Sequence, residues 1–150
     1  MKYIGIFDSG IGGLTVVKSI LEILPNENII YFGDTLNCPY GTRNKDDITR
    51  LALADAKFLN NFDLKALVIA CNTIDSVARS EIEKQYDLPI YGVVLPASKI
   101  AAKTTKNNKI GVIATNATVE SKTYLREITR ENKDAKDALK SADETLASDK

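Results

Sequence analysis

YIGIFDSGIGGLTVVKSILEIL, residues 3–24, places a predicted strand, a loop and a helix one after another. Residues 3–7 are a short apolar run of β-prone side chains. Residues 8–13 contain three glycines and predict a loop. Apolar residues then recur at helical spacing from Leu14 to Leu24, and Pro25 ends the pattern. A strand that turns through a glycine-rich loop into a helix is a building unit of α/β folds.

The same alternation continues along the chain. Further strands are predicted at residues 29–32, 66–70, 90–94 and 109–114, and helices at 45–60, 75–86, 96–103 and 118–128. The strands are almost continuously apolar, which is typical of a parallel sheet with helices on both faces. We therefore predict an α/β fold with a doubly wound, mostly parallel sheet. Ligands bind beyond the carboxyl ends of such strands, so the loops that begin at Asp8, Gly33, Cys71 and Thr115 should converge on one site.

Composition excludes several classes of function. The 150 residues include 20 basic and 20 acidic side chains, so nothing indicates a nucleic-acid partner. No apolar run approaches the roughly 20 residues that span a bilayer, and the start does not look like a signal peptide, so we expect a cytoplasmic protein. The sequence has no histidine, which excludes Ser-His-Asp triads and Cys-His pairs, and its two cysteines form no disulfide framework.

The loop Asp8-Ser9-Gly10-Ile11-Gly12-Gly13 could hold an anionic ligand. Its glycines let the backbone approach a ligand closely, and the following helix offers free N–H groups to a carboxylate. The spacing matches neither the dinucleotide-binding Gly-x-Gly-x-x-Gly pattern nor a P-loop. A structural turn, with Asp8 only capping the helix, is the alternative interpretation.

The segment Ala70-Cys71-Asn72-Thr73 lies between a predicted strand and a predicted helix. The helix dipole there is expected to lower the pKa of the Cys71 thiol, which should make Cys71 more reactive than Cys38. Asn72 and Thr73 supply neutral hydrogen-bonding groups for a polar ligand. The alternative is that Cys71 is a small buried apolar residue.

A polar loop carries Gly33-Asp34-Thr35 and then Pro39-Tyr40-Gly41, with Cys38 as a bystander. Together with the two segments above, it resembles, in order and spacing, the three amino-terminal motifs of glutamate racemases. The resemblance covers about residues 1–128. Aspartate racemases share the chemistry but match these motifs less well.

The resemblance implies interconversion of L- and D-glutamate for peptidoglycan by two acid/base groups, without pyridoxal phosphate, a metal or any other cofactor. It implies that Cys71 is one of the two groups, assisted by Asp8 and Asp34. The substrate would be glutamate, and a homodimer is left open. The implied substrate-binding residues are Asp8, Ser9, Tyr40, Gly41, Asn72, Thr73, Thr115, Asn116 and Thr118.

The sequence also departs from the family pattern. The second thiol of the family belongs to a downstream Cys-Thr-His segment that these residues do not contain. Ile74 and Asp75 replace small residues, and Asn37 replaces a common arginine. We expect residues 1–95 to form a first domain, 96–128 to begin a second, and 129–150, with a thin stripe of Ala138, Leu139, Ala142 and Leu146, to be a charged helical or disordered tail.

Three functions remain open from the sequence. The first is a racemase-family protein, present as a truncated or divergent chain. The second is a catalytically inert module that retains a carboxylate-binding pocket. The third is an unrelated hydrolase that uses Asp8, such as a phosphatase, although the second aspartate it would need is replaced by Gly10.

Overall fold

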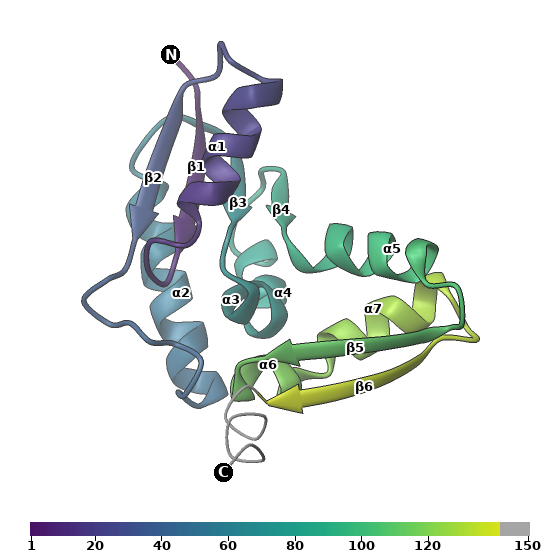
Figure 1. The fold of residues 1–150 in the computed structure, drawn as a ribbon. Helices are drawn as coiled ribbons and strands as arrows, with labels where there is room; N and C mark the ends of the chain where they lie inside the picture. The colour runs from purple at the N-terminus through teal and green to yellow at the C-terminus, as the bar shows by residue number, and fades with distance from the viewer. Residues whose placement is uncertain (142–150) are drawn as a thin grey trace.

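The structure, a computed structural model, describes the backbone of residues 1–141 and the side chains of residues 1–135. Strands and helices alternate along most of the chain, as Figure 1 shows. In chain order the elements are β1 (Tyr3–Asp8), α1 (Leu14–Ile23), β2 (Ile29–Gly33), α2 (Lys45–Leu59), β3 (Leu64–Ile69), α3 (Asn72–Val77), α4 (Arg79–Glu83), β4 (Ile90–Gly92), α5 (Val94–Thr104), β5 (Lys109–Ala114), α6 (Asn116–Ser121), α7 (Thr123–Glu131) and β6 (Lys136–Ser141).

The first α/β unit is a four-stranded parallel sheet in the order β2-β1-β3-β4, and it confirms the predicted fold class. Successive side chains of a strand point to opposite faces, so β1 supplies two cores. Ile4 and Ile6 pack toward α1 on one face. Phe7 packs on the other face, with α2, α3 and α4. The sheet is therefore covered on both sides, with its carboxyl ends free to carry polar loops.

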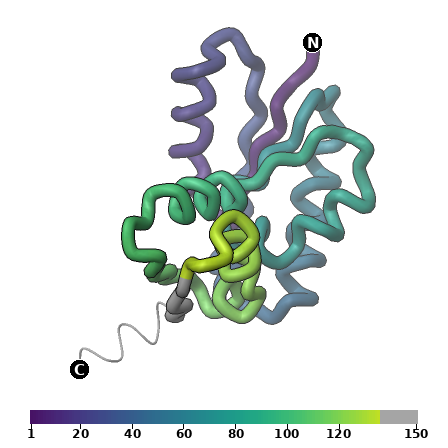
Figure 2. The backbone as a smooth tube through the Cα atoms, turned by 90° about the vertical axis from the view of Figure 1, so that its right-hand side faces the viewer, coloured from purple at the N-terminus to yellow at the C-terminus, as the bar shows by residue number. Residues whose placement is uncertain are grey.

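The second α/β unit contains a separate parallel pair, β5 and β6, so β5 does not extend the first sheet. Along β5 exposed and half-buried residues alternate, which differs from the almost continuous burial we expected. Helices α5 and α7 pack against each other beside this pair. Figures 1 and 2 show the second unit projecting from the end of the first sheet where α3 and α4 lie.

The expected helical or disordered tail differs from the structure at residues 136–141, which form a strand. Helix α7 continues to Glu131, and Lys136–Ser141 forms β6, with Gly111 opposite Ala138 and Val112 opposite Leu139. Pairing with β5 satisfies the backbone of this segment, and such tertiary context overrides weak helix propensity. Ala142 and Leu146 of the proposed stripe lie outside the described residues.

Two predicted helices are each divided in the structure. The helix expected at 75–86 begins earlier, at Asn72, and breaks at Ala78 into α3 and α4. The helix expected at 118–128 is α6 followed by α7, separated by Lys122 in the left-handed conformation with φ of 55°. In the described part of the chain, no helix combines the length and apolarity needed to cross a membrane.

Candidate active site

The glycine-rich loop after β1 is organised by the Asp8 carboxylate. Its two oxygens accept hydrogen bonds from the backbone N–H groups of Ser9 and Gly13, each at 2.8 Å. Asp8 therefore braces the turn that leads into α1, whose first residue follows Gly13, and α1 itself has no side-chain capping hydrogen bond. A side chain at Gly13 would press against the Cβ atoms of Asp8 and Ala70, each 2.9 Å from the position of an added Cβ. The loop thus depends on glycine at this point.

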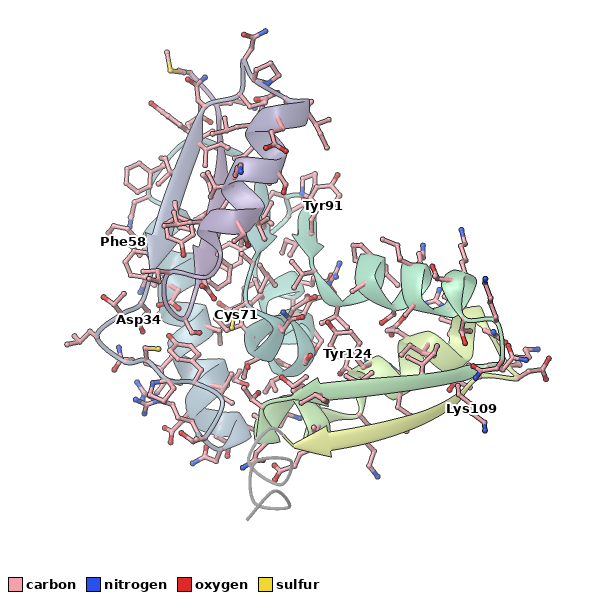
Figure 3. All side chains as sticks on the ribbon, viewed as in Figure 1. Asp34, Phe58, Cys71, Tyr91, Lys109 and Tyr124 are labelled. Carbon is pink, nitrogen blue, oxygen red and sulfur yellow. The ribbon has the colours of Figure 1, made fainter. Side chains whose placement is uncertain are left out.

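The loops after β1 and β3 meet at Cys71. Ser9 Oγ lies 3.3 Å from Cys71 Sγ, and the negative charge of Asp8 acts on the same thiol. Cys71 immediately precedes α3 and is only 7% exposed. Figure 3 shows it at the end of the first sheet, at the junction with the second unit. This confirms the predicted convergence of these two loops.

The expected lowering of the Cys71 pKa is wrong. Burial raises the pKa of the Cys71 thiol, and the Asp8 charge raises it further, while hydrogen bonds from Ser9 and Ile74 oppose the shift. The helix behind it, α3, has only six residues, so little dipole accumulates to offset the burial. The surroundings of Cys71 in this structure therefore favour the thiol over the thiolate.

In the loop after β2, polar side chains form hydrogen bonds with one another inside the protein. The Asp34 carboxylate accepts hydrogen bonds from Asn37 N and Nδ2 and, at 2.6 Å, from the Tyr40 hydroxyl. Tyr40 is 1% exposed and its hydroxyl also lies 2.9 Å from Asp55 Oδ2. The Tyr40 side chain is therefore buried against Asp34 and Asp55 rather than open to a ligand in this structure, and Asp34 braces its own loop. Any ligand contact at this position would have to come from the backbone of residues 40–41.

At Gly41 the loop after β2 contacts the second unit. The Gly41 carbonyl accepts a hydrogen bond from Ala117 N at 3.2 Å, and a Cβ at Gly41 would overlap the Thr115 side chain. Thr115 Oγ1 in turn lies 3.0 Å from both Thr73 Oγ1 and Thr118 Oγ1. This threonine cluster (Thr73, Thr115 and Thr118) brings the loop after β5 to α3, as predicted, although β5 belongs to another sheet.

Asn72 and Asn116 occupy the first turns of two helices. The Asn72 side chain accepts a hydrogen bond from the Tyr124 hydroxyl at 2.6 Å, so α7 contacts α3 beside Cys71. Figure 3 shows Tyr124 below Cys71, on the side of the second unit. Asn116 is the first residue of α6, next to Thr115.

Some residues of this region were not singled out from the sequence. Tyr31 donates a hydrogen bond to Gly10 O at 2.8 Å, and burial together with the nearby Asp8 charge raises its pKa to about 12. In the sequence Tyr31 resembles the other apolar residues of its strand, so no local pattern indicated a role for it in the site. Asp55 did leave a signal, because it is an acid on the apolar side of α2 between Leu51 and Leu59. Tyr124 left none.

A cleft of about 730 Å³, whose lining does not include Cys71, lies between α3–α4 and α6–α7. Its lining holds ion pairs of Arg79 with Glu83 and of Arg126 and Arg130 with Glu127, whereas no ion pair among the described side chains involves Arg43 or Lys45. The cluster around Cys71 is the better candidate because the loops after β1 and β3 meet there. In the part of the chain whose side chains are described, no three His, Cys, Asp or Glu residues are grouped to hold a metal ion.

Comparison with known proteins gives a consistent result. A sequence model of the Asp/Glu/hydantoin racemase family matches residues 4–145, which extends past the limit of about residue 128 that the sequence indicated. A glutamate racemase of Neisseria gonorrhoeae is 53% identical over 132 residues, which cover 87% of this chain and 49% of the relative. The chain thus spans about half the length of the curated relatives that it matches.

Solved structures show the same relationship. The crystal structure of a glutamate racemase isoform from Bacillus anthracis aligns with a TM-score of 0.91 at 38% identity, covering 98% of this chain and 55% of that one. A glutamate racemase from Francisella tularensis, solved in complex with D-glutamate, aligns with a TM-score of 0.85 at 41% identity, covering 93% and 52%.

Proposed function

The chain belongs to the Asp/Glu/hydantoin racemase family, and on that premise we propose that it forms half of a glutamate racemase site, in which Cys71 moves the α-proton on one face of glutamate. The observation that carries the proposal is the placement of the Cys71 thiol 3.3 Å from Ser9 Oγ, between the two loops that the family resemblance singled out. The similarity to a racemase solved with D-glutamate supports glutamate as the ligand.

A thiol suits this chemistry because its ordinary pKa lies near enough to neutrality for it to act as both acid and base. In the free chain, burial and the Asp8 charge favour the protonated form. A bound α-ammonium group beside Asp8 would offset both effects and lower the Cys71 pKa. Substrate binding would then generate the thiolate, with Ser9 donating a hydrogen bond to it.

The developing charge on the substrate also needs hydrogen-bond donors. The described residues offer the hydroxyl groups of Ser9 and Thr73 and the amide of Asn72, all on the Cys71 side of the site. Such preorganised donors stabilise an enolate-like transition state. Asp34 has a positioning role in this proposal, since its carboxylate is bound within its own loop.

Inversion needs a second acid/base group on the opposite face of the α-carbon. Cys38 is the only other cysteine of the 150 residues, and it is exposed in the loop after β2, with its Sγ 3.6 Å from the position of a Cβ added at Gly10. Cys38 therefore lies in the same α/β unit as Cys71, in a loop at the same end of the sheet. We therefore propose that, within these residues, Cys71 transfers the proton on only one face of the α-carbon.

By the same proposal, the whole protein supplies D-glutamate for peptidoglycan in the cytoplasm, without pyridoxal phosphate or a metal. A homodimer is the assembly to test beside this function, and sedimentation at two protein concentrations distinguishes it from a monomer.

Ligand protection of the two thiols tests the binding part of the proposal. At about pH 9, which favours the thiolate of the buried Cys71 more than neutral pH does, iodoacetamide labelling is followed separately at Cys71 and Cys38. Bound glutamate covers the Cys71 thiol, so it should slow labelling of Cys71 even though it lowers the pKa of that thiol, and it should leave Cys38 unchanged. Aspartate should protect less. Equal protection of both thiols, or of neither, would contradict the proposal. Cys38 serves as the internal control.

A further inference from the structure

Helix α3 lies at the centre of the contacts between the two units. Its residue Thr73 meets Thr115, and its Ser76 carbonyl accepts a hydrogen bond from Thr123 Oγ1 at 2.8 Å. Helices α5, α6 and α7 of the second unit all contact it. Because Cys71 immediately precedes this helix, whatever holds the second unit on α3 also places that unit relative to the thiol.

Asp75 is the charged residue within this junction, and its side chain is 1% exposed. Its Oδ2 accepts a hydrogen bond at 2.8 Å from the backbone N–H of Val94, the first residue of α5. Val93, which precedes α5, has no polar side chain to cap the helix. A carboxylate from α3 therefore satisfies the start of α5, where negative charge is favourable.

Arg79 completes the arrangement from α4. Its Nη1 lies 3.5 Å from Asp75 Oδ1, and its Nη2 donates a hydrogen bond to the carbonyl of Ile90 at 3.1 Å. Burial raises the pKa of Asp75, while the Val94 N–H and the Arg79 charge oppose that shift. The carboxylate is thus tied to α4, to β4 through Arg79, and to α5 directly.

The backbone between β4 and α5 passes close to the Asp75 carboxylate. The three atoms nearest to a Cβ added at Gly92 are all in the Asp75 carboxylate group, and the added atom would overlap them. Gly92 is the last residue of β4, directly before the segment that leads into the second unit. Asp75 and Gly92 are therefore sterically coupled where the chain passes from one unit to the other.

We infer that Asp75 is a positioning residue that fixes the second α/β unit on the helix that begins at Cys71. A carboxylate buried away from solvent is costly unless its partners repay the desolvation. Here Oδ2 accepts from the first N–H group of α5, while Oδ1 has no hydrogen-bond partner among the described residues and is stabilised by the charge of Arg79 at 3.5 Å. This inference goes beyond the proposed function and does not depend on racemase chemistry.

Amide exchange at Val94, measured by NMR, tests the inference in the full chain. In Asp75→Ala the Val94 amide should exchange at least about tenfold faster, while β1 amides keep their protection. In Asp75→Asn the carboxamide oxygen still accepts the hydrogen bond, so most of the Val94 protection should return. Glu81→Gln, which affects only an exposed pair with Lys84 on α4, is the matched control and should change neither region.

A second readout is the alkylation rate of Cys71. It should rise several-fold in Asp75→Ala, because the second unit no longer holds its place beside the thiol, and it should return toward the wild-type rate in Asp75→Asn. Unchanged Val94 exchange in Asp75→Ala, or equal loss of protection at Val94 and in β1, would overturn the inference.

A double-mutant cycle remains informative if Asp75→Ala is poorly stable. Gly92→Ala should lower the Tm strongly in the presence of Asp75, and the double variant Asp75→Ala/Gly92→Ala should melt no lower than Asp75→Ala alone. Additive losses in Tm would mean that Asp75 and Gly92 do not share this contact, and would contradict the inference.

Discussion

The two α/β units are built from the same kind of segment, a parallel strand followed by a helix, yet they are stabilised differently. The first has four strands with a core on each face. The second has two strands, and along β5 every other residue is exposed, including Ile113 at 67%. The second unit is held to the first by polar contacts of the threonine cluster, Tyr124 and Asp75, and by Ala117 of α6, which packs in the core of the first unit. The second unit therefore depends on the first for its position.

The largest expected effect comes from the core of the first unit. Ile6 is fully buried on β1, and Ile6→Ala should lower the free energy of unfolding by about 2–5 kcal/mol. The same truncation at the exposed Ile113 of β5 should cost less than about 0.5 kcal/mol. Urea unfolding of both variants measures the difference. Equal losses would show that Ile113 is as well packed in solution as Ile6, and that the second unit has a core comparable to that of the first.

A pH dependence is expected from Asp55 in the first unit. Burial raises the pKa of Asp55 to about 7, with the Tyr40 hydrogen bond opposing and the Asp34 charge adding to the shift. The folded state keeps a proton that the unfolded state releases above about pH 4, so stability falls as the pH rises from about 4 to 7 and changes no further because of this group.

The variant Asp55→Asn isolates this contribution, because its carboxamide can donate to Tyr40 at any pH. As the pH rises from about 4 to 8, the free energy of unfolding of Asp55→Asn should increase relative to that of the wild type. The expected change is on the order of 2 kcal/mol, after allowance for solvent screening. Thermal unfolding across this range measures it. A stability difference that stays constant with pH would show that Asp55 is already ionised in the folded chain.

A smaller effect is expected where the two units meet. Thr115→Val removes the hydroxyl shared by Thr73 and Thr118 and should cost about 1 kcal/mol. Since this contact belongs to the junction, hydrogen exchange should rise in α6 and stay unchanged in β1 and β3. Thr49→Val, on the exposed face of α2, removes a comparable hydroxyl as a control. Loss of protection in the first sheet would mean that the units do not open separately.

Chemical labelling of the two cysteines perturbs the structure least, because it needs no substitution. Cys38 is exposed, whereas Cys71 is buried with a raised pKa, so iodoacetamide at about pH 7 should label Cys38 at least about tenfold faster. This reverses the order expected from the sequence. Mass spectrometry of the alkylated peptides at several times measures both rates, and faster labelling of Cys71 would show that the junction opens readily in solution.

The sequence was sufficient for the fold of the first unit because periodicity and glycine position are local signals. The strand ends at Asp8 and Gly33 and the turn from β3 to α3 at Cys71 follow from them, and so does the meeting of Ser9 with Cys71. The pKa of Cys71 could not be predicted, because it depends on burial by distant elements. The inward orientation of Tyr40 depends on Asp55, 15 residues away, and strand β6 on its pairing with β5. These are tertiary effects that no local pattern contains.

The central claim is that Cys71 exchanges a proton on one face of glutamate. The most direct measurement is the α-proton of L- and D-glutamate by NMR, with the enantiomer ratio, during incubation of the purified chain in D₂O. The account predicts slow exchange of one enantiomer without inversion, lost in Cys71→Ala and retained in Cys38→Ala. Exchange that persists in Cys71→Ala, or inversion at an enzymatic rate of about 1 s⁻¹ or faster, would contradict it.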